Sequence, residues 1–457
     1  MSPGVSRDRR PSAGQPRPLR LPEFETFELS SGIEVWVATR HTVPEVSLRL
    51  ILEAGATHDD PERAGVGDLT GRLLTEGAAD RDARAMAEWI DRLGAAFHAS
   101  IRYDVAVLSM HFLPEVTAEA LDYLATVARH PTYDPDEVTR VRGERLDEVT
   151  RDGDEPAIVA DVSLIAAVYE DHPYGRPADG LWDTVSRIDV EDVRAFHARR
   201  YSSSDARIVV CGDVEPELLR DGLEARFGDW AAATGRSAPP ERPSGGGRPG
   251  TLLIDRPGSP QAELRIGAVG AAHSTPDQYA ISMANAILGG LFNSRMNMNL
   301  REDKGWTYGA RTSFLLRRGA GPFVARTAVE TGVTADAIEE MHAEIRGMRE
   351  TPPTDEEIAL ARNALTLSLP LQFETASAIG RRVTRQLVYD LPRDYWETYR
   401  ARIEAVTRDD VLAACERYLH EDGLTTLVVA DGAVAAPHLE RLGPVEETEP
   451  SGFGPVE

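Results

Sequence analysis

The sequence predicts an α+β fold of two homologous halves, each a mostly antiparallel sheet covered by helices, joined by a flexible linker into a clamshell. The first observation is an internal duplication: the helix and strand of residues 185–212 recur at 404–430, and Asp192-Val193 is answered by Asp410-Val411, 218 positions later. The second is a stretch rich in glycine, proline and serine at residues 235–250, a composition typical of a flexible linker. A repeat of this length excludes a solenoid.

Composition narrows the classes of partner. The chain has 457 residues, of which 42% are hydrophobic, and a formal net charge of −25. That charge argues against nucleic acid, because phosphate binding needs a basic face, and leaves room for cationic or neutral partners such as peptides. No segment approaches the roughly 18 consecutive apolar residues of a membrane span.

The ends of the chain read as disordered. Residues 1–21 carry five arginines and four prolines without an apolar segment, which fits neither a secretory signal nor a transit peptide. Residues 437–457 are rich in Glu, Pro and Gly. We therefore expect a cytoplasmic protein with folded halves at 22–234 and 251–436, the linker at 235–250, and disordered tails at 1–21 and 437–457.

The first half alternates between strand and helix patterns. Residues 24–40 predict a hairpin around Ser31-Gly32, and residues 46–52 predict a half-buried strand. Asp59-Asp60-Pro61 supplies an N-cap and a first-turn proline for a helix within 64–77. The patterns that follow predict a helix at 83–93, a strand at 96–113, helices at 117–128, 134–151 and 185–201, and a strand at 206–212.

The second half repeats these elements. The segment 262–269 corresponds to the strand at 46–52 in the repeat, and the acidic helix start at 355–358 corresponds to the one at 136–138. A helix at 404–418 and a strand at 424–430 close the repeat.

The helix within 64–77 has the frame of a metal-binding motif. Asp68, Gly71 and Arg72 lie at i, i+3 and i+4, on one face and one turn long. Helical zinc motifs place two histidines at i and i+4 with a glutamate beside them as base. Here an acid, a glycine and a permanent cation stand instead.

The sequence predicts no replacement zinc site. No two of the 11 histidines lie within five residues of each other, and Cys211 and Cys415 form no Cys-x-x-Cys motif. Both cysteines lie in apolar patterns, so we interpret them as buried small residues.

Several short motifs, in this order and spacing over some 400 residues, carry a resemblance. They are Ser31-Gly32-Ile33, Glu53-Ala54-Gly55, the helix at 64–77, Asp171-His172-Pro173-Tyr174-Gly175, Ile287-Leu288-Gly289-Gly290, Ser294-Arg295 through Leu300-Arg301-Glu302, and Gly305-Trp306-Thr307-Tyr308. Together they resemble the pitrilysin-type, insulinase-like zinc peptidases, specifically the short branch that includes the mitochondrial processing peptidase subunits.

The resemblance implies a degenerate metal site. Active members of that family carry His-x-x-Glu-His on the first helix and a second Glu downstream as third zinc ligand. The two histidine positions fall on Asp68 and Arg72, the base position on Gly71, and the third ligand position near Glu148, a possible relic. We hypothesise that Arg72 fills the vacated space and pairs with Asp68 and with Glu148; the alternative is an ordinary exposed i, i+4 pair.

The second half keeps a different family feature. In paired members, one subunit carries the zinc helix and the other an Arg-x6-Tyr pair, and Arg301 and Tyr308 have that spacing. A phenol O–H can donate to the oxyanion of peptide hydrolysis, and a guanidinium can hold a backbone carbonyl. The alternative is that Arg301 pairs with Glu302 or Asp303 while Tyr308 packs at a strand start. The family's peptide-binding edge strand corresponds to residues around 100–105.

These implications favour a non-catalytic, substrate-binding subunit of a heterodimeric zinc metallopeptidase that degrades or processes peptides. A homologous partner would carry the zinc helix and the zinc, while this chain would bind no cofactor, would not hydrolyse peptides by itself, and would supply Arg301 and Tyr308. Two alternatives stay open: a scaffolding homologue like the core subunits of respiratory complexes, and a peptidase with a relocated site.

Overall fold

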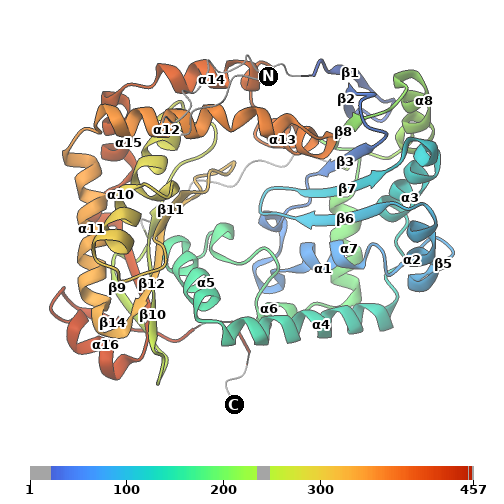
Figure 1. Ribbon diagram of the computed structural model, residues 1–457. Helices are drawn as coiled ribbons and strands as arrows, with labels where there is room; N and C mark the ends of the chain where they lie inside the picture. The colour runs from blue at the N-terminus through green and yellow to red at the C-terminus, as the bar shows by residue number, and fades with distance from the viewer. Residues whose placement is uncertain (1–21, 234–246, 451, 455–457) are drawn as a thin grey trace, which may run out of the picture.

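A computed structural model describes residues 22–233, 247–450 and 452–454, and it shows two lobes of similar build (Figure 1). The first lobe contains a six-stranded sheet in the order β1-β2-β8-β3-β7-β6. Its strands are β1 (Glu25–Glu28), β2 (Glu34–Thr39), β3 (Val46–Leu52), β6 (Ala96–Ile101), β7 (Ala106–Phe112) and β8 (Arg207–Gly212). All neighbours are antiparallel except β2 and β8.

The second lobe repeats this sheet in the order β11-β12-β10-β13-β9-β14. Its strands are β9 (Gly250–Asp255), β10 (Gln261–Val269), β11 (Arg311–Phe314), β12 (Pro322–Glu330), β13 (Thr425–Ala430) and β14 (Val445–Glu447). Strands β9, β13 and β14 pair in parallel and the others antiparallel. The two-halved, mostly antiparallel α+β fold is therefore confirmed.

Helices cover both sheets. In the first half of the chain they are α1 (Val66–Leu73), α2 (Ala83–Arg92), α3 (Thr117–Arg129), α4 (Pro135–Asp154), α5 (Pro156–Tyr169), α6 (Trp182–Val185), α7 (Val190–Arg200) and α8 (Pro216–Phe227). In the second they are α9 (Gln278–Asn285), α10 (Arg295–Asn297), α11 (Thr334–Glu350), α12 (Asp355–Leu367), α13 (Ala376–Val388), α14 (Tyr395–Ala405), α15 (Arg408–Tyr418) and α16 (Gly432–Leu439). Among the described residues, no helix is both long and apolar enough to cross a bilayer.

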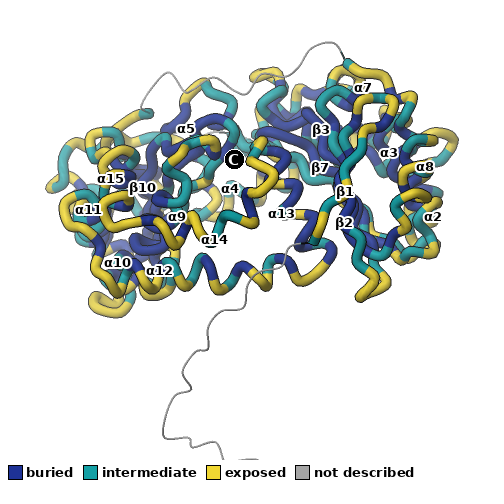
Figure 2. Tube along the Cα trace, turned by 90° about the horizontal axis from the view of Figure 1, so that it is seen from above, coloured by how far each residue is buried: buried dark blue, intermediate teal, exposed yellow. Residues whose placement is uncertain are grey.

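The lobes exchange one helix each. Helix α5 belongs to the first half of the chain but packs on β10 and β13, whereas α13 belongs to the second half and packs on β3 and β8. In Figure 1, α13 reaches across from the second lobe toward β8 and β3. Each sheet is thus buried on both faces, and Figure 2 shows the buried residues gathered in the two lobes.

Four sequence expectations need correction. The strand at 46–52 is buried on both faces instead of one, because α13 covers its second face. The strand at 96–113 is a hairpin, β6–β7, that turns at residues 102–105 without Gly or Pro. The helix at 185–201 is α6 followed by α7, which Asp189 caps. Likewise, α14 ends at Ala405 before α15 begins.

The proposed C-terminal tail is also wrong for the residues that the structure describes. Residues 437–439 complete α16, and β14 pairs with β9 at the edge of the second sheet. An edge strand with unpaired backbone groups favours such coverage. The predicted tail at 1–21 and most of the predicted linker lie outside the described residues.

Candidate functional site

Helix α1 is fixed from its N-terminus. Gly65 adopts φ +98°, which only glycine accommodates readily, and Asp59 accepts hydrogen bonds from the backbone N–H groups of Gly65 and Gly67. Burial raises the pKa of Asp59 to about 7, although these two hydrogen bonds oppose the shift. The helix then buries Leu69 and Leu73 against α7, α4 and β6, which leaves Asp68 and Arg72 on its remaining face.

Asp68, Arg72, Arg145 and Glu148 form one ion-pair cluster, here called the Arg72 cluster. Arg72 Nε lies 2.6 Å from Asp68 Oδ2, and Arg72 Nη1 lies 3.0 Å from Glu148 Oε2. Arg145 Nη1 also contacts Glu148 Oε2, at 3.1 Å. The structure thus shows both pairings that we hypothesised for Arg72.

The charges in this cluster are mutually dependent. Burial raises the pKa of Asp68, against the opposing charge of Arg72. Burial also acts to raise the pKa of Glu148, but hydrogen bonds from Arg72 and Arg145 outweigh it and hold that pKa below its usual value. Burial acts to lower the pKa of Arg72, but Asp68 and Glu148 raise it further, so the guanidinium stays charged.

This donor set does not fit zinc. A guanidinium has no lone pair to give and repels a dication, and here it already neutralises the two carboxylates that could serve as ligands. At Gly71, where the resemblance implies the base, a Cβ would lie 2.7 Å from Ile101 Cδ1 of β6, so a side chain there would require Ile101 to move. Within residues 22–233, 247–450 and 452–454, no group of three or more His, Cys, Asp or Glu side chains is placed to hold a metal.

Arg301 and Tyr308 lie in the other lobe, away from the Arg72 cluster. Arg301 belongs to a short π-helical segment, η6 (Met298–Asp303), a geometry often found at functional sites. Its guanidinium stacks 4.7 Å from the ring centroid of Phe292 and lies 3.4 Å from Glu302 Oε1. Tyr308 follows in a loop and is 93% exposed, so it does not pack at a strand start.

The strand expected to receive peptide lies at the edge of the first sheet. Strand β6 is the last in the order, so one side of its backbone pairs with no strand. It spans Ala96–Ile101, while residues 102–105 form the turn that follows. The edge position is as expected, but the expected residues lie mostly in the turn.

Sequence reasoning missed a set of contacts where the lobes meet. Arg318 donates to both carboxylate oxygens of Glu53, at 2.5 and 2.6 Å. Tyr174 donates to Asp104 Oδ1 at 2.6 Å and accepts from Gly319 N–H at 3.0 Å. Glu53 and Tyr174 belong to motifs that carry the family resemblance, but their partners are too distant in the sequence to be predicted. Cys211 and Cys415 are buried and unpaired.

Comparisons with known proteins place both halves of the chain in one peptidase family. Residues 35–180 match the insulinase family, peptidase family M16, and residues 187–365 match the peptidase M16 inactive domain. A protein of Mycobacterium leprae named an uncharacterized zinc protease is 24% identical over 86% of this chain and 88% of its own length. A Bacillus subtilis protein named the uncharacterized zinc protease YmxG is 23% identical over 90% of this chain and 99% of its own length.

Solved structures share the whole fold. The structure titled a peptidase M16 inactive domain from Pseudomonas fluorescens is 26% identical, covers 89% of this chain and 98% of that chain, and superposes with a TM-score of 0.81. A protease from Helicobacter pylori, 16% identical, covers 90% of this chain and 100% of its own, with a TM-score of 0.84. The likeness thus extends over both lobes.

Proposed function

The chain belongs to the insulinase-like M16 peptidase family, and on that premise we propose that it is a non-catalytic, substrate-binding subunit of a heterodimeric zinc metallopeptidase acting on peptides. The observation that carries the proposal is the pairing of the Arg72 guanidinium with Asp68 and Glu148, on the helix where the family resemblance implies the zinc-binding histidines. A homologous partner would supply the zinc helix. The inactive-domain title of the Pseudomonas fluorescens relative supports the same assignment.

In this proposal Arg301 and Tyr308 extend into the partner's active chamber. The exposed phenol of Tyr308 donates to the oxyanion that forms on the scissile carbonyl, and Arg301 holds a neighbouring backbone carbonyl of the peptide. Tyr308 is 93% exposed, whereas Arg301 would have to give up its 3.4 Å contact with Glu302 and its stacking on Phe292 to hold a peptide. By contrast, Arg295 is committed to Glu357 through two hydrogen bonds.

The proposal is tested by mixing this chain with a homologous His-x-x-Glu-His chain from the same genome and measuring peptide cleavage. We expect the isolated chain to hold no stoichiometric zinc by elemental analysis and to show no chelator-sensitive activity. Arg301→Ala and Tyr308→Phe should each lower kcat of the mixture about 10²–10³-fold, as removal of one oxyanion donor does.

Arg346→Ala is the matched control, because Arg346 is an exposed arginine of the same lobe that pairs only with Glu421 in the described part of the chain. It should leave kcat unchanged. Full activity of the partner alone, or a mixture indifferent to both site variants, contradicts the proposal.

A further inference from the structure

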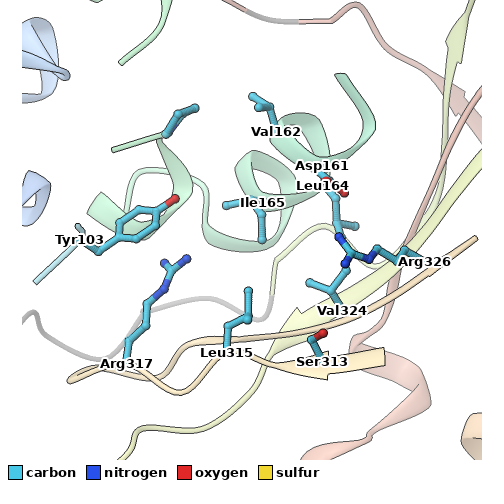
Figure 3. A pocket seen from close by; sticks show the side chains of 11 residues that line it. Tyr103, Asp161, Val162, Leu164, Ile165, Ser313, Leu315, Arg317, Val324 and Arg326 are labelled. Carbon is cyan, nitrogen blue, oxygen red and sulfur yellow. The ribbon is translucent and has the colours of Figure 1, made fainter. Parts of the chain in front are cut away.

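A pocket of about 310 Å³ lies where the two lobes meet, apart from the Arg72 cluster and from Arg301 and Tyr308 (Figure 3). Its walls come from α5, from the β6–β7 turn, and from strands β11 and β12 with the loop between them. Ile165, Leu315 and Val324 give it apolar surfaces. Its volume is at the small end of the roughly 300–1,000 Å³ that ligand pockets occupy.

One cation, Arg317, is built into this pocket. Figure 3 shows its guanidinium pointing into the cavity beside Tyr103. The residue is only 9% exposed, and its Cζ lies 3.5 Å from the ring centroid of Tyr103 and 4.5 Å from that of Tyr174. Its Nη1 is nevertheless buried with no hydrogen-bond partner among the described residues. Buried donors are rarely left unsatisfied, so this one calls for an acceptor.

The next residue in the chain, Arg318, is an arginine whose guanidinium does have hydrogen-bond acceptors. Arg318 donates to both oxygens of Glu53 and to the carbonyl of Val388. Arg317 has no such acid, although its backbone carbonyl is held by the N–H of His273 at 2.7 Å. Unlike Arg318, Arg317 thus has no acid paired with its guanidinium among the described residues.

The pocket is lined by two arginines and one acid. Arg326 also lines the pocket, and the described part of the chain places no acid in an ion pair with Arg317 or Arg326. The acid in the wall, Asp161, is neutralised by Arg265. An anion in the pocket would therefore meet two arginines for which the described residues supply no ion-pair partner.

We propose that this pocket binds the C-terminal residue of a peptide, with its carboxylate on Arg317 and an apolar side chain against Ile165, Leu315 and Val324. Guanidinium and carboxylate form strong charge-assisted hydrogen bonds, which gain strength in a partly buried site. Beside the pocket, β11 is the edge strand of its sheet among the described residues, and an edge strand can pair with a peptide but not with an acyl chain. The inference is independent of the proposed function, because it concerns binding by this chain alone.

The test is fluorescence anisotropy on the isolated full chain, with dye-labelled hexapeptides that end in leucine as either the free acid or the amide. We expect saturable binding of the acid at least tenfold tighter than binding of the amide. Arg317→Gln should abolish this difference. Equal affinities for acid and amide, or a difference that survives Arg317→Gln, would overturn the proposal.

A second variant guards against misfolding of Arg317→Gln. Leu315 is 48% exposed, so Leu315→Asp should fold normally while it places a negative charge in the pocket; we expect at least a tenfold loss of affinity for the acid peptide. Leu113→Asp, at a 53% exposed leucine of the other lobe, is the matched control and should bind normally. Equal weakening by both variants, or displacement of the peptide by equimolar octanoate, would overturn the assignment to a peptide C-terminus.

Discussion

Where the family resemblance implies a zinc-binding histidine, Arg72 forms ion pairs, and we expect these pairs to stabilise the fold. A histidine at this position is neutral and can give a lone pair, whereas an arginine is always charged and needs acids around it. Asp68 and Glu148 are those acids, since both form ion pairs with Arg72. The side chains are partly buried, which makes the loss of one partner costly to the others.

Arg72→Ala should therefore lower the free energy of unfolding at pH 7 by about 1–3 kcal/mol, the cost of leaving a buried polar group unpaired. The loss should begin to shrink as the pH falls toward 4, because Asp68, whose pKa burial raises, is protonated first. Arg72 and Arg145 hold the pKa of Glu148 below its usual value, so the contribution of Glu148 disappears only at lower pH. Urea unfolding at both pH values measures this.

Arg84→Ala is the comparison for Arg72→Ala, since the Arg84 side chain is 87% exposed and pairs with Glu88 at i+4. It should change the free energy of unfolding by less than about 0.5 kcal/mol. An Arg72→Ala loss no larger than this, or a loss independent of pH, would mean that the cluster is only an ordinary surface pair.

Sequence reasoning at the residue scale succeeded where partners are close in the chain. The i, i+4 spacing predicts the contact of Arg72 with Asp68, and the resemblance points to Glu148. It could not find Arg317, because an arginine's missing partner is visible only once every neighbour is placed. Glu53 and Arg318 likewise meet across 265 positions.

The exchanged helices explain the main errors at the element scale. The alternating apolar residues of this strand face the first lobe's own core: Val46, Leu48, Leu50 and Leu52. Because they alternate with Ser47 and Arg49, the sequence predicts that the other face of the strand is exposed to solvent. Instead α13 covers that face, where Gly380 approaches closely: a Cβ there would lie 3.2 Å from Arg49 Nε and 3.4 Å from Ser47 Oγ. The hydrophobic periodicity of one half cannot predict that a helix from the other half covers its sheet.

The β6–β7 hairpin shows a second limit of pattern reading. Residues 102–105 turn without Gly or Pro, so the run from 96 to 113 looks continuous. The turn is held from elsewhere: Gly55 packs so closely that a Cβ would lie 2.4 Å from the carbonyl carbon of Asp104. A tertiary contact thus fixes the position of a turn that the local amino-acid composition does not predict.

The exchange also predicts matched effects in the two lobes. Ile379 on α13 and Leu164 on α5 are both fully buried against the sheet of the opposite half. Ile379→Ala and Leu164→Ala should each lower the free energy of unfolding by about 2–5 kcal/mol, with one cooperative transition retained. Denaturant unfolding followed by tryptophan fluorescence measures both. Leu371→Ala, at a 70% exposed leucine, should stay near wild type. Separate transitions for the two halves would contradict the argument.

At the scale of the whole molecule, contacts between the lobes lead us to expect one cooperative unit. The loop of residues 317–320 is gripped by the first half: Arg318 pairs with Glu53, Gly319 N–H donates to Tyr174, and Tyr169 donates to the carbonyl of Ala320 at 2.8 Å. Removing one partner of a buried ion pair typically costs about 3–5 kcal/mol. Together with α5 and α13, these contacts bind the halves more firmly than a linker could.

Two fragments of the chain that lack residues 234–246 should therefore assemble with each other. We expect fragments 1–233 and 247–457, expressed together with a tag on one, to copurify in equal amounts and to elute as one species on size exclusion. Each fragment alone should be insoluble or unfolded, because it would expose the sheet face that the other covers, including Trp36, Ile51 and Val209 in the first half.

The matched substitutions separate this mechanism from nonspecific association. Ile379→Asp in the second fragment places a charge on the face of α13 that meets the first sheet, so it should abolish copurification. Leu371→Asp, at an exposed position of the same region, should leave it intact. Fragments that fold alone and elute separately would show that the linker, and not the exchange of α5 and α13, holds the halves together.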